Sequence, residues 1–140
     1  MKGCFLEDLY VGQTAEKHYL VDEAAIQRFA EASGDHNPLH MDEAFAAKSF
    51  FKGRIAHGML AGAYLSAVLG TMLPGPGAIY MSQTLNFRRP VRIGDEVTAQ
   101  VAVAAIDEAK GRVTFTTVCK VDGKRVVTGE AVCLVARRGG

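Results

Sequence analysis

Cysteine is scarce in this sequence, and the few that occur fit neither of its common structural uses. Cys4, Cys119 and Cys133 are odd in number and far apart, and no Cys-x-x-Cys pair is present. Such a set argues against a disulfide framework and against a zinc site. The sequence therefore favours a reducing compartment, and we expect the protein in the cytoplasm.

An excess of charge of one sign is missing as well. Sixteen Lys and Arg residues against 15 Asp and Glu residues give a formal net charge of +1, without a basic or acidic run. This balance gives no support to nucleic-acid or acidic-membrane binding, so we expect neither partner. The N-terminus carries Lys2, Glu7 and Asp8 and no sustained apolar core, which argues against a signal peptide.

The most apolar stretch, residues 55–73, lacks the uniform composition of a membrane span. It contains His57, Ser66 and three glycines, so a buried helix that is apolar on nearly every face is the better interpretation. The Pro-Gly-Pro-Gly segment at 74–77 ends this helix.

Small residues recur every four positions along the same helix. Gly58, Gly62, Ser66 and Gly70 form one ridge of minimal side chains. Such a ridge allows a sheet or a ligand to approach the helix backbone closely, or it serves close packing alone. The sequence supports both interpretations equally.

The remaining pattern places short helices early and strands late. We expect a first strand within 13–21, and then a helix that starts after the N-cap Asp22 and stops at Gly34. A short helix follows at 42–48, with Phe45 facing inward. Alternating apolar residues and the hairpin signal Asp122-Gly123 then predict strands at 79–88, 97–103, 113–121 and 126–135. This order predicts an α+β fold with an antiparallel sheet wrapped around one buried helix.

Residues capable of proton transfer gather in the segment from Ser33 to His40. It reads Ser-Gly-Asp-His-Asn-Pro-Leu-His, and His57-Gly58-Met59 follows later at the start of the apolar helix. A carboxylate, an imidazole and an uncapped helix start are what proton transfer beside an oxyanion requires. Taken singly these residues are ordinary, because Asp35 beside a glycine is typical of turns and a lone His40 is more often structural than catalytic.

The order of these motifs, before a buried helix and four strands, resembles that of the MaoC-like hot-dog family. Within this family the (R)-specific enoyl-CoA hydratases are the most similar group. The resemblance is carried by Gly12-Gln13, 33–40, 55–60 and 94–97, and so extends over nearly the whole chain. It implies the hot-dog fold and a single domain over residues 1–140.

The resemblance also implies a reaction. A hydro-lyase of this family adds water syn across the double bond of a trans-2-enoyl-CoA and gives an (R)-3-hydroxyacyl-CoA. Asp35 and His40 would hold the water between them and share the acid and base roles, with either of them as the donor of the α-proton. The Gly58 amide, in the unsatisfied first turn of the long helix, would donate a hydrogen bond to the thioester oxygen.

Four further residues are implied in substrate binding. Asn37 would brace the loop, and His57 would shape the helix start without acting as a third catalyst. A serine inside a buried helix usually bonds its own i−4 carbonyl. By resemblance, Ser66 instead lines the acyl pocket together with Leu69, and Cys133 lies near the pocket end.

The resemblance implies an acyl-CoA substrate, no cofactor and a homodimer. Arg88, Arg89 and Arg92 form the densest basic group, which either meets the phosphates of coenzyme A or is solvated surface. Polyhydroxyalkanoate synthesis and other fatty acid metabolism, such as fatty-acid oxidation, both remain open as pathways that use the product.

Three other functions compete with hydration. A hot-dog thioesterase usually carries a carboxylate on the long helix, and residues 58–73 contain none. A 3-hydroxyacyl-thioester dehydratase acting on acyl carrier protein runs the same chemistry in reverse, and the neutral charge leaves it open. A non-catalytic acyl-thioester-binding module would be expected to lack Asp35 or His40, and both are present.

A metal site is the remaining rival for the same residues. His36, His40, Asp42 and His57 are the available ligands, but they form neither a His-x-x-x-His helix pair nor a Cys/His quartet. Hydration by an Asp–His pair needs no metal, so we expect none.

Overall fold

The computed structural model describes residues 2–140. The helices and strands follow in this order: η1 (Leu6–Asp8), β1 (Thr14–Leu20), α1 (Glu23–Ser33), α2 (Pro38–Met41), α3 (Glu43–Ala47), α4 (Gly58–Thr71), β2 (Ile79–Gln83), β3 (Asn86–Phe87), β4 (Glu96–Asp107), β5 (Arg112–Val121) and β6 (Lys124–Leu134). After β1, the helices precede the remaining strands, as the sequence predicts.

The strands form one antiparallel sheet in the order β1-β4-β5-β6-β2, and the short β3 also pairs with β6. The predicted hairpin between β5 and β6 turns at Asp122 and Gly123. Both residues have positive φ, at 51° and 75°. An Asp-Gly pair is favoured in tight hairpins because these residues tolerate that conformation.

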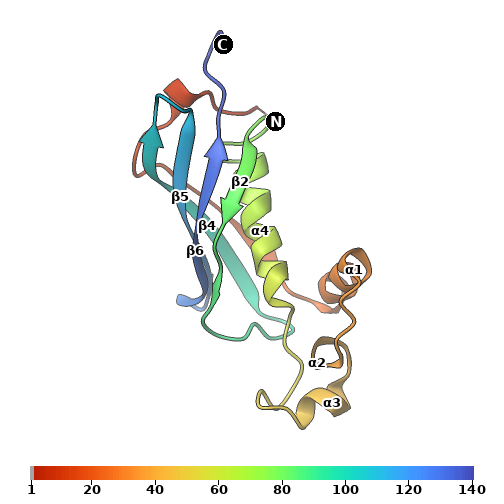
Figure 1. Cartoon of the computed structure of the whole chain (residues 1–140). Coiled ribbons are helices and arrows are strands. Elements are labelled where there is room, and N and C mark those ends of the chain that lie inside the picture. Colours follow the sequence, from red (N-terminus) through yellow and green to blue (C-terminus); the bar gives the residue numbers. More distant parts are fainter. Residues whose placement is uncertain (1) are drawn as a thin grey trace.

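Helix α4 packs along this sheet and contacts β4, β1, β5 and β6 (Figure 1). Its buried residues include Leu60, Leu65, Val68 and Leu69. They share one core with the inward residues of β4 and β5, which are Val97, Ala99, Val101, Val103, Val113, Phe115 and Cys119. The α+β hot-dog arrangement, with an antiparallel sheet around a long buried helix, is therefore confirmed.

The small-residue ridge of α4 is packed at one end only. A Cβ at Gly58 would lie 2.7 Å from the Phe87 ring, and a Cβ at Gly62 would lie 3.0 Å from a Leu85 methyl. Nothing lies within 4 Å of the corresponding position at Gly70. Close packing therefore accounts for the first two glycines, with Phe87 of β3 and Leu85 just before that strand as the packing neighbours.

Helices α2 and α3 lie beyond the N-terminal end of α4 and α1 lies beside that end, all three away from the two chain termini (Figure 1). Asp22 and Asp42 cap α1 and α3 by accepting first-turn amides, and α1 ends at Gly34 with φ 79°. The predicted inward orientation of Phe45 is wrong. Its side chain is 54% exposed, because the five residues of α3 turn Ala46 toward the core instead.

The predicted strand over 79–88 is interrupted and forms β2 and β3 with a break at Thr84 and Leu85. The Thr84 carbonyl passes so close to β6 that a Cβ at Gly129 would meet its oxygen at 1.8 Å. Glycine at 129 therefore permits this crossing. β2 ends one side of the sheet with Ile79 and Met81 exposed.

No helix within residues 2–140 combines the length and apolarity that crossing a membrane requires.

Candidate active site

The loop between α1 and α2 is built by successive side-chain turns that fix Asp35. The Asp35 amide donates to the Ser33 hydroxyl at 3.1 Å, and the Asn37 amide donates to Asp35 Oδ1 at 3.1 Å. Asn37 Oδ1 then accepts the Leu39 amide at 3.0 Å and caps α2, with Pro38 at the first helical position. Short polar side chains thus fix the conformation of this loop through hydrogen bonds between residues two positions apart. Asp35 remains exposed.

His40 is held in one orientation by two backbone contacts. Its Nδ1 lies 2.8 Å from the Ile55 carbonyl oxygen, so Nδ1 carries the proton and donates to it. The Arg54 guanidinium donates to the His40 carbonyl at 2.6 Å. His40 is only 8% exposed, and with the Nδ1 hydrogen directed at the Ile55 carbonyl the other ring nitrogen, Nε2, is left to face the site.

His57 connects the start of α4 to the Asp35 loop. Its Nε2 donates to the Asp35 carbonyl oxygen at 2.9 Å, across 22 positions of sequence. The ring packs against those of His40 and Phe29, with centroids 4.1 Å and 4.9 Å away. The side chain is 3% exposed, and Nδ1 has no hydrogen-bond partner within residues 2–140.

Burial lowers the pKa of His57 below its ordinary value of 6.5, because the charged ring would lose its hydration. The neighbouring His40 acts in the same direction, and the hydrogen bond to the Asp35 carbonyl acts against it. His57 is therefore a neutral ring near pH 7, and as such it can position the loop without adding positive charge beside His40.

The first turn of α4 opens beside these residues. His57 occupies the N-cap position but makes no side-chain capping bond, and Gly58 is the first helical residue and is exposed. The amides at a helix start have no partner in the helix and lie at the positive end of its dipole. The site therefore offers hydrogen-bond donors for developing negative charge.

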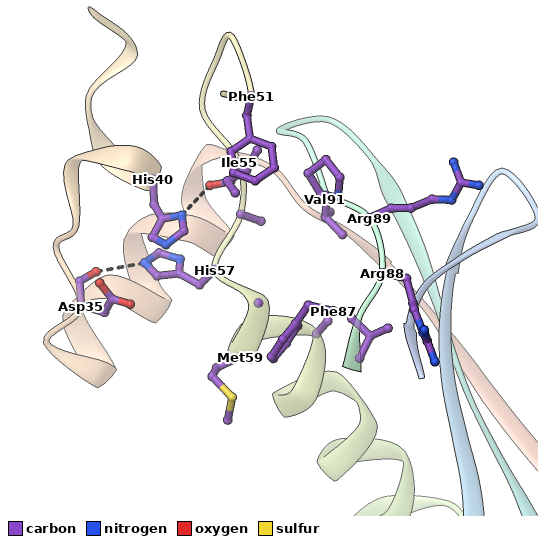
Figure 2. A pocket seen from close by; sticks show the side chains of 15 residues that line it. Asp35, His40, Phe51, Ile55, His57, Met59, Phe87, Arg88, Arg89 and Val91 are labelled. Carbon is purple, nitrogen blue, oxygen red and sulfur yellow. Dashed lines mark hydrogen bonds between the residues drawn. The ribbon is translucent and has the colours of Figure 1, made fainter. Parts of the chain in front are cut away.

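One pocket of about 420 Å³ brings these parts together (Figure 2). Asp35, His40 and His57 stand on one side, Phe87 lies across from them beside the helix start, and Arg88 and Arg89 point outward at the far end (Figure 2). The other lining residues are Phe51, Ile55, Ala56, Gly58, Met59, Ala61, Pro90, Val91 and Val127.

The structure separates the residues that the sequence analysis placed around the substrate. Asp35, His40, His57 and Gly58 line this pocket, whereas Asn37 acts behind it as the cap of α2. Ser66 is half-buried and lines a second, largely apolar cavity of about 360 Å³ that shares Met59 with the first. Leu69 is 2% exposed in the core and lines neither cavity.

Phe87 and Met59 line the pocket but were not among the predicted site residues. Phe87 belongs to an alternating strand pattern that does not distinguish a pocket wall from a sheet residue. Met59 follows His57-Gly58 directly, and that proximity to the motif was the available signal for it.

A set of possible metal ligands exists, but it differs from the one considered in the sequence. Asp35, His40 and His57 each place a ligand-type atom within 4.8 Å of the others. Asp42 instead caps α3, and His36 is exposed. His40 Nδ1 and His57 Nε2 are each engaged with a backbone carbonyl, which leaves the Asp35 carboxylate, His40 Nε2 and the unpartnered His57 Nδ1 as the possible ligand atoms.

The predicted arginine group divides in two. Arg88 and Arg89 line the outer end of the pocket. Arg92 instead points back to the loop before α4, where its guanidinium donates to the Gly53 carbonyl at 3.5 Å.

Comparison with known proteins gives consistent matches over almost the whole chain. Residues 11–125 match the model of the MaoC like domain. The chain is 51% identical over 135 residues to the (R)-specific enoyl-CoA hydratase of Rhodospirillum rubrum, covering 96% of this chain and 94% of that protein. It is 46% identical to the 3-hydroxybutyryl-CoA dehydratase of Methylorubrum extorquens, covering 99% and 88%. Among solved structures, the R-hydratase PhaJ1 from Pseudomonas aeruginosa superimposes with a TM-score of 0.91 at 46% identity, covering 96% and 87%.

Proposed function

Because the chain belongs to the MaoC-like family, we propose that it is an (R)-specific enoyl-CoA hydratase, a hydro-lyase that adds water to trans-2-enoyl-CoA. The observation that carries this proposal is the opening of one pocket onto both a carboxylate–imidazole pair and an uncapped helix start. By their names, the two relatives from Rhodospirillum rubrum and Methylorubrum extorquens act on acyl-CoA thioesters, one as a hydratase and one as a dehydratase.

The Asp35–His40 pair suits the activation of a single water. Two hydrogen bonds of about 2.8 Å from one water span roughly 4.6 Å. The ligand-type atoms of Asp35 and His40 lie within 4.8 Å of each other, which is close enough for one water to bond to both. As its oxygen attacks the β-carbon, the pair takes one proton and delivers one to the α-carbon on the same face. The product gains one water in total, and the addition is syn.

Charge develops on the thioester oxygen during this attack. The Gly58 amide at the start of α4 is placed to donate a hydrogen bond to it, with the helix dipole behind. Glycine is suited to this position because a Cβ would strike Phe87 and narrow the approach.

The other predicted residues have supporting roles in the proposal. Asn37 caps α2 and so fixes the segment that carries His40, and His57 fixes the Asp35 backbone. An acyl chain that passes Met59 would enter the second cavity and reach Ser66. Because that cavity is largely apolar, it would suit the hydrocarbon chain of an acyl substrate.

Spectrophotometry with trans-2-butenoyl-CoA tests the activity. Loss of the enoyl absorbance without release of free thiol identifies hydration, whereas thiol release identifies a thioesterase. Chiral chromatography of the hydrolysed product should give mostly the (R)-3-hydroxy acid. A mostly (S) product would contradict the assignment, and activity restricted to acyl-carrier-protein thioesters would favour the dehydratase alternative.

We further propose a homodimer of single-domain subunits. One core runs from Leu6 to Val135, which supports a single domain over residues 1–140. β2 is an edge strand with Ile79 and Met81 exposed, and such an edge needs covering. Light scattering that gives a 15.0 kDa particle at micromolar concentration would contradict the dimer. The three cysteines are free, which supports a reducing compartment such as the cytoplasm.

A further inference from the structure

A second hollow, about 450 Å³, adjoins the outer end of the catalytic pocket and is lined by four cations. Arg88 and Arg89 line both spaces, and Lys124 and Arg125 complete the hollow together with Thr128. No carboxylate is among its lining residues. We call these five residues the basic groove. In a chain whose formal net charge is only +1, this is a strong local concentration of positive charge.

The cations of the basic groove are not engaged with acidic partners. The three ion pairs within residues 2–140 involve His18, Arg54 and Arg138, so none of the four takes part. Four like charges around one hollow repel each other unless an anion binds between them. The groove is therefore arranged for a multiply charged anion.

The groove is also built on fixed backbone. The Arg88 and Arg89 amides both donate to the Val126 carbonyl, and the Arg88 guanidinium donates to the Thr128 hydroxyl at 3.1 Å. Lys124 and Arg125 begin β6 directly after the tight turn at Gly123. Arginine in such a setting binds phosphate oxygens through paired donors.

We propose that the basic groove binds the phosphate groups of the coenzyme A moiety of the substrate, an inference that rests on the proposed function. Arg88 and Arg89 join the groove to the catalytic pocket, and their guanidinium groups point away from Asp35 and His40 (Figure 2). A thioester held at Gly58 would thus direct its carrier arm past Pro90 to the four cations. The concave shape favours a small polyanion over the surface of a carrier protein.

A double variant, Lys124→Ser with Arg125→Ser, tests the groove against a matched control at the opposite end of the β5–β6 strand pair. The control is Lys110→Ser with Arg112→Ser, which removes two exposed cations from the β4–β5 turn and the start of β5. Each protein is assayed with trans-2-butenoyl-CoA and with the N-acetylcysteamine thioester of the same acid, which carries no phosphate. Calorimetry measures the binding of free coenzyme A.

The groove variant should raise KM for the CoA thioester by about 10- to 100-fold with little change in kcat, since charge-assisted hydrogen bonds are lost. The ratio of kcat/KM between the two thioesters should fall by the same factor, and binding of free coenzyme A should weaken and lose part of its salt dependence. The control variant should behave as the wild type in all three measurements.

Other outcomes would overturn the proposal. Equal losses on both thioesters would indicate general damage, and unchanged KM and coenzyme A binding would indicate a merely solvated surface. If the same assays are run with the acyl-carrier-protein thioester of this acid as a third substrate, a loss confined to that substrate would assign the groove to the carrier protein. Absence of hydration by the wild type would refute the proposed function, whereas the coenzyme A binding measurement tests the groove independently of it.

Discussion

The starts of α1 and α4 differ in a way that separates stability from function. At α1, Asp22 Oδ1 accepts the Ala25 amide at 2.9 Å, and α2 and α3 are capped similarly by Asn37 and Asp42. At α4, the longest helix, the cap position holds His57, whose side chain caps nothing. A missing cap costs a helix about 1 kcal/mol. The candidate active site lies at the start of α4, where no side chain caps the first-turn amides.

Substitutions of Asp35 and His40, which lie in front of the uncapped start of α4, should have the largest effect on activity. Asp35→Asn and His40→Gln should each lower kcat by roughly 10²–10⁴-fold, because each keeps a polar group but removes a proton-transfer group. The double variant should cost far less than the product of the two, since both residues act on one water. Steady-state kinetics and melting temperature are measured on all three. Variants with a lowered melting temperature but a kcat near that of the wild type would show that Asp35 and His40 are structural residues and not catalytic ones.

The open amide at α4 can be removed while the helix is kept. Proline is favoured at the first helical position, and His57 at φ −57° and ψ 131° already has the extended backbone that precedes a proline. Gly58→Pro should lower kcat by about 10²–10³-fold through loss of the N–H donor. It is made together with Phe87→Ala, which clears the ring from the added atoms.

The matched control for that variant is Gly58→Ala with Phe87→Ala, which adds a Cβ but keeps the amide. It should retain most of the kcat of Phe87→Ala alone. Equal losses in the proline and alanine variants would show that the space beside Gly58 matters and its N–H does not.

Removal of the cap at the start of α1 should lower stability and leave activity unchanged. Asp22→Ala should lower the free energy of unfolding by about 1 kcal/mol, because the first-turn amide of α1 loses its partner. Since Asp22 lines neither the pocket nor the basic groove, kcat should not change. Chemical denaturation and steady-state assays measure both quantities, and a large loss of kcat would end the contrast between the two helix starts.

The smallest expected effect concerns the pH dependence of stability. The pKa of His57 is lowered in the folded protein, so the unfolded chain binds more protons as pH falls through 6.5. The stability contributed by the neutral ring is complete above that pH and is lost below it. His57→Gln should therefore flatten the decline of melting temperature in acid.

Features set by near neighbours in the chain could be read from the sequence. Asp22 and Gly34 bound α1 as predicted, because capping and a positive φ depend on a few adjacent residues. The same holds for the Asp122-Gly123 turn. The one-turn helix α2 was missed, since Asn37-Pro38 serves a helix start and a turn equally well.

Features that depend on distant contacts could not be read. The break at Thr84 requires Gly129 on another strand, and no local signal marks it. The bond from His57 to the Asp35 carbonyl joins residues 22 positions apart, so the motif predicted the two residues but not how one holds the other. The basic groove likewise combines Arg88 with Lys124 only after β3 and β6 have paired.

The packing of Phe87 and Leu85 against the two glycines of α4 limits how this pocket can be remodelled. The helix already presents the smallest residue at 58 and 62, so no substitution there can enlarge the space. An engineer seeking longer substrates must trim Leu85 or Phe87 on the opposing segment. Any side chain added to the helix would first have to displace one of them.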